Sequence, residues 1–274
     1  MIPAISQVCS LNSSFEDDVD QYAAGQCQAI EVWLTKLETF LQSHSVDDFQ
    51  RLRDEHGVTF PVASFQGGIL ASQGEARRVA WDQFRTRLEL CQQLEIGTIV
   101  VAMDVARPIS QTDVERVQLS LVEATQEAAR RGVRIALEFQ AGSAFGNNLQ
   151  TAAALVEEVG SPSLGLCLDV VHFYTGPSKT EDLEYLTAQN LFHVQLADLA
   201  DTPREFVADS LRIVPGDGDI PLQPLIDRLH AINYAGHVSL ELMNPQIWQI
   251  PALQIGEIGM TALRKLLGQA SMGS

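Results

Sequence analysis

Four side chains with oxygen donors lie inside short apolar runs, and their types could do chemistry together. They are Glu138 in RIALEFQ, Asp169 in LGLCLDVVHF, Gln195 in FHVQLAD and Glu241 in HVSLELM. Each run has the length and apolar content of a buried β-strand. A carboxylate or an amide among apolar neighbours costs free energy unless a partner compensates it, and a divalent cation can compensate all four together. The sequence therefore predicts a metal site made of these residues.

The elements that must position these residues alternate between strand-like and helix-like segments. Four further strand-like runs come earlier in the chain, at residues 4–9, 29–34, 58–65 and 98–103. Eight strands that alternate with helices within 274 residues favour an α/β fold, a single (β/α)8 TIM barrel over residues 1–274 without a domain boundary. Catalytic side chains of such barrels lie at the carboxyl ends of the strands, which is where the last four strands carry the four predicted ligands.

Local signals predict where the helices begin and end. A capping box at Thr112–Glu115 is expected to open a helix that ends at Gly132. Other helices are expected from about 75 to 94 and from about 148 to Gly160. The connection 199–222 after the seventh strand is expected to lack regular structure, which is typical of functional or mobile loops.

Composition and charge exclude several classes of function. A net charge of −17 disfavours binding to nucleic acids and to anionic membranes. The sequence contains no apolar run near the length that spans a bilayer, and MIPAISQVCSL does not resemble a leader, so a cytoplasmic location is expected. The four cysteines form no CxxC pair and are expected to be reduced structural thiols.

Five motifs give the chain a family resemblance over nearly its whole length. ALEF, LDVVHF, HVQLAD, PGDGDI and LELMNP resemble the xylose-isomerase-like superfamily of sugar isomerases and epimerases. The resemblance is to a branch with Glu, Asp, Gln and Glu as metal ligands, which includes hydroxypyruvate isomerases and bacterial 3-dehydroshikimate dehydratases. Many ketose epimerases carry His at the third position, so Gln195 departs from them. Oxygen-only ligands favour Mn²⁺ or Mg²⁺, and they also accept Co²⁺ or Zn²⁺.

The resemblance also implies catalytic roles. Glu138 and Glu241 would be both ligands and acid–base groups on opposite faces of the substrate, which would react through a metal-bound enediolate. His172, three residues after Asp169, would contact the substrate or carry a proton; the alternative is a structural histidine at a strand end. His193 would lie on the face of Gln195 and support it from one layer deeper.

Several other residues are candidates for contacting the substrate. Arg204 in TPREF and Arg212 in DSLRIVPGDGD are predicted to bind it, and two convergent guanidinium groups would indicate a carboxylate on the substrate. Both arginines could instead be solvated loop charges. Glu31 is expected to line the mouth of the barrel and to bind the substrate, and a structural role is the alternative. Trp248 lies where family members can donate a loop to a neighbouring subunit, so a homo-oligomer is compatible with the sequence.

These features favour one function and leave two alternatives open. The first is a metal-dependent isomerase or epimerase that acts on a small sugar or hydroxy-carbonyl compound. The main alternative is a lyase that resembles 3-dehydroshikimate dehydratase, and a metal-free binding barrel is the other. An abasic-site endonuclease is excluded, because its zinc cluster is rich in histidine and the chain has only 6 His and a net charge of −17.

Overall fold

The fold is a closed barrel of eight strands in sequential order, as the sequence predicts. The computed structural model describes residues 1–269. The strands are β1 (Ile2–Ser6), β2 (Ala29–Trp33), β3 (Thr59–Gln66), β4 (Thr98–Met103), β5 (Arg134–Phe139), β6 (Leu164–Asp169), β7 (Leu191–Leu196) and β8 (His237–Leu240). The (β/α)8 fold class is therefore confirmed.

Helices follow the strands along the chain. The α-helices are α1 (Phe15–Ala24), α2 (Leu34–Phe40), α3 (Val46–His56), α4 (Gly74–Gln93), α5 (Gln111–Ala129), α6 (Leu149–Val159), α7 (Val170–Thr175), α8 (Gln223–Ala231) and α9 (Ala252–Leu266). Short 3-10 helices are η1 (Gln7–Ser10), η2 (Thr180–Tyr185), η3 (Arg204–Phe206), η4 (Asp209–Leu211) and η5 (Ile247–Gln249). Within residues 1–269, none of the helices combines the length and the apolar character needed to cross a bilayer.

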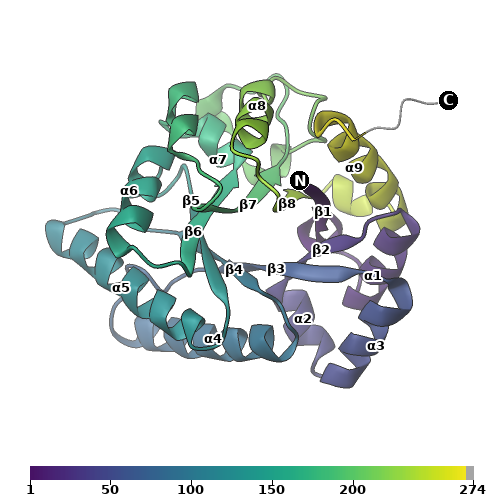
Figure 1. Cartoon of the computed structure of the whole chain (residues 1–274), viewed down its shortest axis with the longest axis horizontal. Helices are drawn as coiled ribbons and strands as arrows, with labels where there is room; N and C mark the ends of the chain where they lie inside the picture. The colour runs from purple at the N-terminus through teal and green to yellow at the C-terminus, as the bar shows by residue number, and fades with distance from the viewer. Residues whose placement is uncertain (270–274) are drawn as a thin grey trace. The chain divides into compact units, whose positions relative to one another are not determined.

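The chain divides into two compact units, and the first joins both ends of the sequence. Among the described residues it comprises 1–61 and 194–269. In this unit β1 pairs in parallel with β2 and with β8, and β7 pairs with β8. The register places Ser6 opposite Glu31, and Gln195 opposite Ser239. Helix α9 lies alongside α1, as Figure 1 shows in yellow and purple. The prediction of one domain over the whole chain stays a prediction.

The second unit, residues 62–193, contains the middle strands. Here β4 pairs in parallel with β3 and β5, and β5 with β6. Their interior side chains form a core of Val62, Val100, Ala136 and Cys167, against which Phe192 packs. Helices α4, α5 and α6 follow one another along the outside of these strands (Figure 1). Apolar residues on consecutive parallel strands thus give this unit its own core.

Several boundaries differ from those predicted. The first strand ends at Ser6 rather than at Cys9, because the chain turns into η1. The capping box of α5 is formed by Ser110 and Asp113, two residues before the predicted one. Helix α6 ends at Gly160 as predicted, where a φ of 61° suits glycine. The connection 199–222 is partly regular, since it contains η3, η4 and a bridge between Asp198 and Ile213.

The four cysteines, which the sequence predicts to be reduced structural thiols, are all buried. None of them takes part in a disulfide within residues 1–269. Burial raises the pKa of the Cys27 and Cys91 thiols to about 12. They are therefore protonated, unreactive thiols at neutral pH.

Candidate metal and acid–base site

Two carboxylates and an imidazole converge in the unit formed by residues 62–193. Glu138 lies on β5, Asp169 is the last residue of β6, and His172 lies in the first turn of α7. One ligand atom from each lies within 4.8 Å of the other two, and His172 Nε2 is 3.8 Å from Glu138 Oε1. Asp169 is fully buried and Glu138 is 5% exposed. Such a cluster can hold a divalent cation or exchange a proton between Glu138 and His172.

A helical turn, and not an extended strand, brings His172 close to Asp169, three residues earlier in the sequence. The run LDVVHF predicts an extended segment, but β6 ends at Asp169 and α7 begins at the next residue. Asp169 Oδ1 accepts the backbone N–H groups of Val171 and His172, at 2.6 Å and 3.1 Å. The carboxylate thus caps α7, and the helical turn brings His172 back beside it. The predicted strand-like run is therefore too long, and the alternative of a histidine at a strand end does not hold, because His172 lies in α7.

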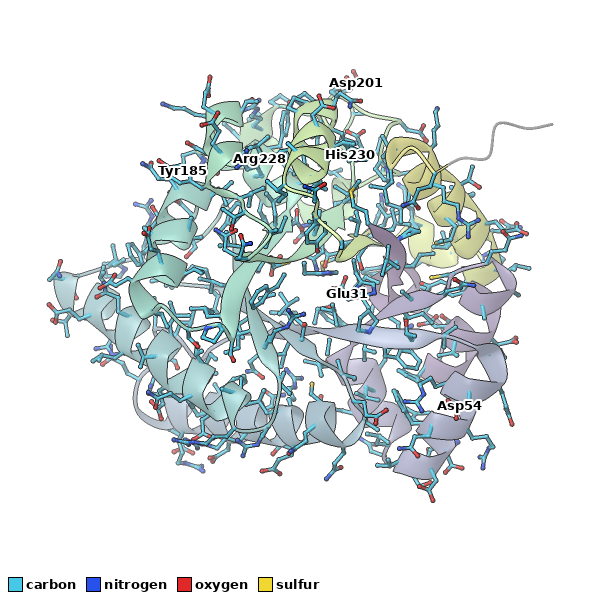
Figure 2. All side chains as sticks on the ribbon, in the orientation of Figure 1. Glu31, Asp54, Tyr185, Asp201, Arg228 and His230 are labelled. Carbon is cyan, nitrogen blue, oxygen red and sulfur yellow. The ribbon has the colours of Figure 1, made fainter. Side chains whose placement is uncertain are left out.

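A second polar group lies in the other unit and centres on Gln195. Its Nε2 donates to Glu31 Oε1 at 2.8 Å and to Glu241 Oε1 at 2.9 Å. Gln195 and Glu31 are at most 1% exposed, and Glu241 is 5% exposed. Figure 2 shows Glu31 among the strands, whereas Asp54 of the same unit lies outside on α3. Glu31 lies on β2, Gln195 lies on β7, and Glu241 directly follows β8, so three strands position one buried hydrogen-bonded group.

Arg212 joins this group from the connection after β7. Its Nη1 donates to Glu241 Oε2 at 2.8 Å, while Nε and Nη2 lie 3.0 Å and 2.8 Å from Asp209 Oδ1. Asn244 Nδ2 also donates to the carbonyl oxygen of Arg212, at 3.0 Å. The side chain of Arg212 is only 1% exposed. Arg212 therefore binds a predicted acid–base group, which excludes the alternative of a solvated loop charge.

Arg204, the other predicted substrate arginine, lies in a different environment. It begins η3 and is exposed. Its contact with a substrate stays a prediction. The sequence predicted both arginines of the connection 199–222 to bind the substrate. In the structure Arg212 is buried and Arg204 is exposed.

Asp198 organises the glycine-rich turn of the connection after β7. Its carboxylate accepts backbone N–H groups from Leu199, Gly216, Gly218 and Ile220 at 2.9–3.1 Å. A Cβ on Gly218 would lie 2.4 Å from the carbonyl oxygen of Leu199, so only glycine fits there. PGDGD is thus a turn folded around a buried carboxylate. The signal in the sequence was an acid two residues after the end of β7, followed by a glycine-rich turn.

Trp248 lies against its own chain. Its indole Nε1 donates to the carbonyl oxygen of Val8 at 2.7 Å, and Asn12 Nδ2 donates to the carbonyl oxygen of Trp248 at 3.1 Å. The segment after β8 is thereby fixed to the segment after β1. Assembly into a homo-oligomer stays a prediction.

Comparisons with known proteins place the chain among TIM-barrel enzymes. Residues 20–266 match the family model described as xylose isomerase-like TIM barrel. Inosose isomerase of Halalkalibacterium halodurans is 28% identical over 246 residues, which cover 88% of this chain and 87% of the relative. The 3-dehydroshikimate dehydratase of Pseudomonas putida is 25% identical over 273 residues, which cover 96% of this chain and 41% of the relative.

A solved structure shows the same fold. The IolI protein with a bound zinc atom superposes with a TM-score of 0.92 at 23% identity, covering 99% of this chain and 100% of that chain. A likeness over the full length of both chains confirms the barrel architecture.

Proposed function

Because the chain belongs to the xylose isomerase-like TIM barrel family, we propose that it is a divalent-metal-dependent isomerase or epimerase of a small sugar or hydroxy-carbonyl compound. The observation that carries the proposal is the convergence of Glu138 from β5, Asp169 from the end of β6 and His172 from α7, whose ligand atoms lie within 4.8 Å of one another. The inosose isomerase relative, which matches 88% of this chain, supports the isomerase class and a polyhydroxylated cyclic ketone as substrate.

The donor set suits a divalent cation. We assign Glu138, Asp169, Gln195 and Glu241 as ligands, because each lies at the carboxyl end of its strand or directly after it. Three carboxylates and an amide oxygen favour Mn²⁺ or Mg²⁺ and also accept Zn²⁺, the ion bound in the IolI structure. His172 is assigned to the substrate or to proton transfer, since its Nε2 lies beside Glu138.

The chain's own residues would divide the proton chemistry between two glutamates. A cation held by these residues would polarise the carbonyl group of the substrate and thereby acidify the neighbouring C–H bond. In an isomerisation one of Glu138 and Glu241 would take this proton and the other would return one to the former carbonyl carbon, while the hydroxyl proton of the first carbon would pass to the former carbonyl oxygen. In an epimerisation the second glutamate would return a proton to the same carbon from the opposite face. Arg212 and Gln195 each bind one oxygen of Glu241 and so fix its orientation.

The lyase alternative has one observation in its favour. The dehydratase relative aligns with 96% of this chain, although this chain spans less than half of that relative. The same base would remove a proton next to a ketone, and the hydroxyl on the β-carbon would then leave as water with the proton returned by the second glutamate.

Proton exchange in heavy water tests the proposal. The protein with Mn²⁺ is incubated with an inosose in D₂O, and deuterium uptake next to the carbonyl is followed by NMR. We expect Glu138→Gln and Glu241→Gln to lower the rate by at least about 100-fold, which is the low end for loss of a general acid or base. Glu257→Gln, an exposed acid on α9, is the matched control and should exchange normally.

Two results would count against the isomerase. One is the absence of exchange with inososes and other small ketoses. The other is the formation of aromatic absorbance from 3-dehydroshikimate, lost in the same two glutamine variants, which would establish the lyase instead.

A further inference from the structure

Both amide hydrogens of Gln195 are directed at carboxylates, and this fixes which atom the residue offers to a ligand. We propose that Glu31 is a positioning residue that acts with Glu241 to hold the Gln195 amide, so that its Oε1 is the atom presented to a cation. The inference rests on the proposed metal site and assigns a role to a residue outside its ligand set.

The geometry uses the full donor capacity of the amide. A primary amide carries two N–H donors and one carbonyl acceptor. Nε2 of Gln195 lies 2.8 Å from Glu31 Oε1 and 2.9 Å from Glu241 Oε1, so each hydrogen has its own acceptor. With the amide rotated by 180°, its carbonyl oxygen would face two carboxylate oxygens and lose both bonds. The two glutamates therefore select one of the two amide orientations.

Burial strengthens this selection. Glu31 is fully buried and Gln195 is 1% exposed, so water cannot replace a lost bond at low cost. Glu31 lies on β2, which pairs with β1, whereas Gln195 lies on β7, which pairs with β8. Their bond therefore spans the unit and is not a consequence of adjacent strands. A residue 164 positions away in sequence holds the amide in place.

The same geometry explains why glutamine suits this position better than histidine. An imidazole that binds a cation through one nitrogen has a single N–H left to donate. It could serve Glu31 or Glu241, and the other carboxylate would remain buried with one partner fewer. An amide supplies one ligand oxygen and two donors together. Glu31 and Gln195 are thus a matched pair.

Metal affinity tests the role of Glu31 separately from catalysis. The metal-stripped full-length protein is titrated with Mn²⁺ by calorimetry, beside Glu31→Leu, Glu31→Gln and the surface control Glu257→Gln. We expect Glu31→Leu to weaken binding about 10- to 100-fold, the usual effect of removing a group that orients a ligand. Glu31→Gln keeps an acceptor of nearly the same shape and should lose less. The control should bind as the unsubstituted protein does.

A double-mutant cycle shows whether Glu31 acts through Gln195. In a Gln195→Leu background, Glu31→Leu should change the Mn²⁺ affinity by less than about 3-fold, because the group it positions is gone. An equal loss in both backgrounds would overturn the inference, since Glu31 would then act on the cation directly. Unchanged affinity in Glu31→Leu and Glu31→Gln would overturn it as well. Absence of Mn²⁺ binding by the unsubstituted protein would instead refute the proposed metal site itself.

Discussion

At the scale of single residues, the connection after β7 contributes a buried guanidinium, that of Arg212, which pairs with the buried carboxylate of Glu241. Arg212 is the bulkiest of the fully buried side chains among residues 1–269, and its guanidinium binds Glu241 and Asp209. The sequence predicted an arginine for the substrate from the same loop. The observed pairing makes Arg212 part of the support for Glu241, because a carboxylate at this depth needs a charged or hydrogen-bonded partner.

Removing this guanidinium should therefore cost substantial stability. Arg212→Met keeps much of the side-chain volume but leaves Glu241 without its cation. We expect the free energy of unfolding in urea at pH 7 to fall by about 3–5 kcal/mol, as for other broken buried ion pairs. Arg204→Met, in the exposed turn η3, should change it by less than about 0.5 kcal/mol. A loss for Arg212→Met as small as the one expected for Arg204→Met would show that the Arg212–Glu241 bond contributes little.

At the scale of elements, side-chain caps decided boundaries that hydrophobic patterns could not. The run LGLCLDVVHF is mostly apolar and includes two adjacent valines, so its pattern predicts one long strand. The chain changes from β6 to α7 where Asp169 caps the helix. This cap is one side chain that accepts two backbone N–H groups, and hydrophobic periodicity carries no information about it. The elements themselves were predictable. The boundary between β6 and α7, which places His172 beside Glu138 and Asp169, was not.

The capping box of α5 gives a pH-dependent prediction. Hydrogen bonds from the Ser110 side chain, from Arg116 and from the Ser110 backbone lower the pKa of Asp113 to about 2. Because the folded pKa lies below the unfolded value, this carboxylate stabilises the fold above about pH 4, and the contribution is lost as pH falls towards 2. Asp113→Asn should thus have a lower urea midpoint at pH 7, and the difference from the unsubstituted protein should shrink between pH 4 and pH 3.

A neighbouring acid provides the control for this experiment. Glu115→Gln alters an exposed acid in the same helix that takes no part in the capping box. Its urea midpoint should follow that of the unsubstituted protein at every pH. A constant difference for Asp113→Asn from pH 7 to pH 3 would contradict the assigned role of the carboxylate.

At the scale of the whole molecule, the barrel was predictable and the contacts that complete the site were not. Eight apolar runs of strand length, separated by helical segments, are repeated local signals, so their sum indicates the fold. The acids within those runs identified Glu138, Asp169 and Glu241 as candidates. The bonds of Gln195 to Glu31 and of Arg212 to Glu241 join residues 164 and 29 positions apart. No local pattern encodes such pairs, because they depend on tertiary packing.

A specific cation site should also couple to the stability of the whole chain. At a Mn²⁺ concentration about 100 times Kd, binding to the folded state alone adds about 2.7 kcal/mol. For a chain of this size we expect Tm to rise by about 5–10 °C and to fall back when EDTA is added.

A net charge of −17 attracts cations without specificity, so some increase in Tm would occur at any acidic surface. Glu138→Gln separates the two effects, because it removes one proposed ligand and only one of many charges. If Mn²⁺ raised the Tm of Glu138→Gln as much as that of the surface variant Glu257→Gln, the stabilisation would be non-specific and the proposed site would be wrong.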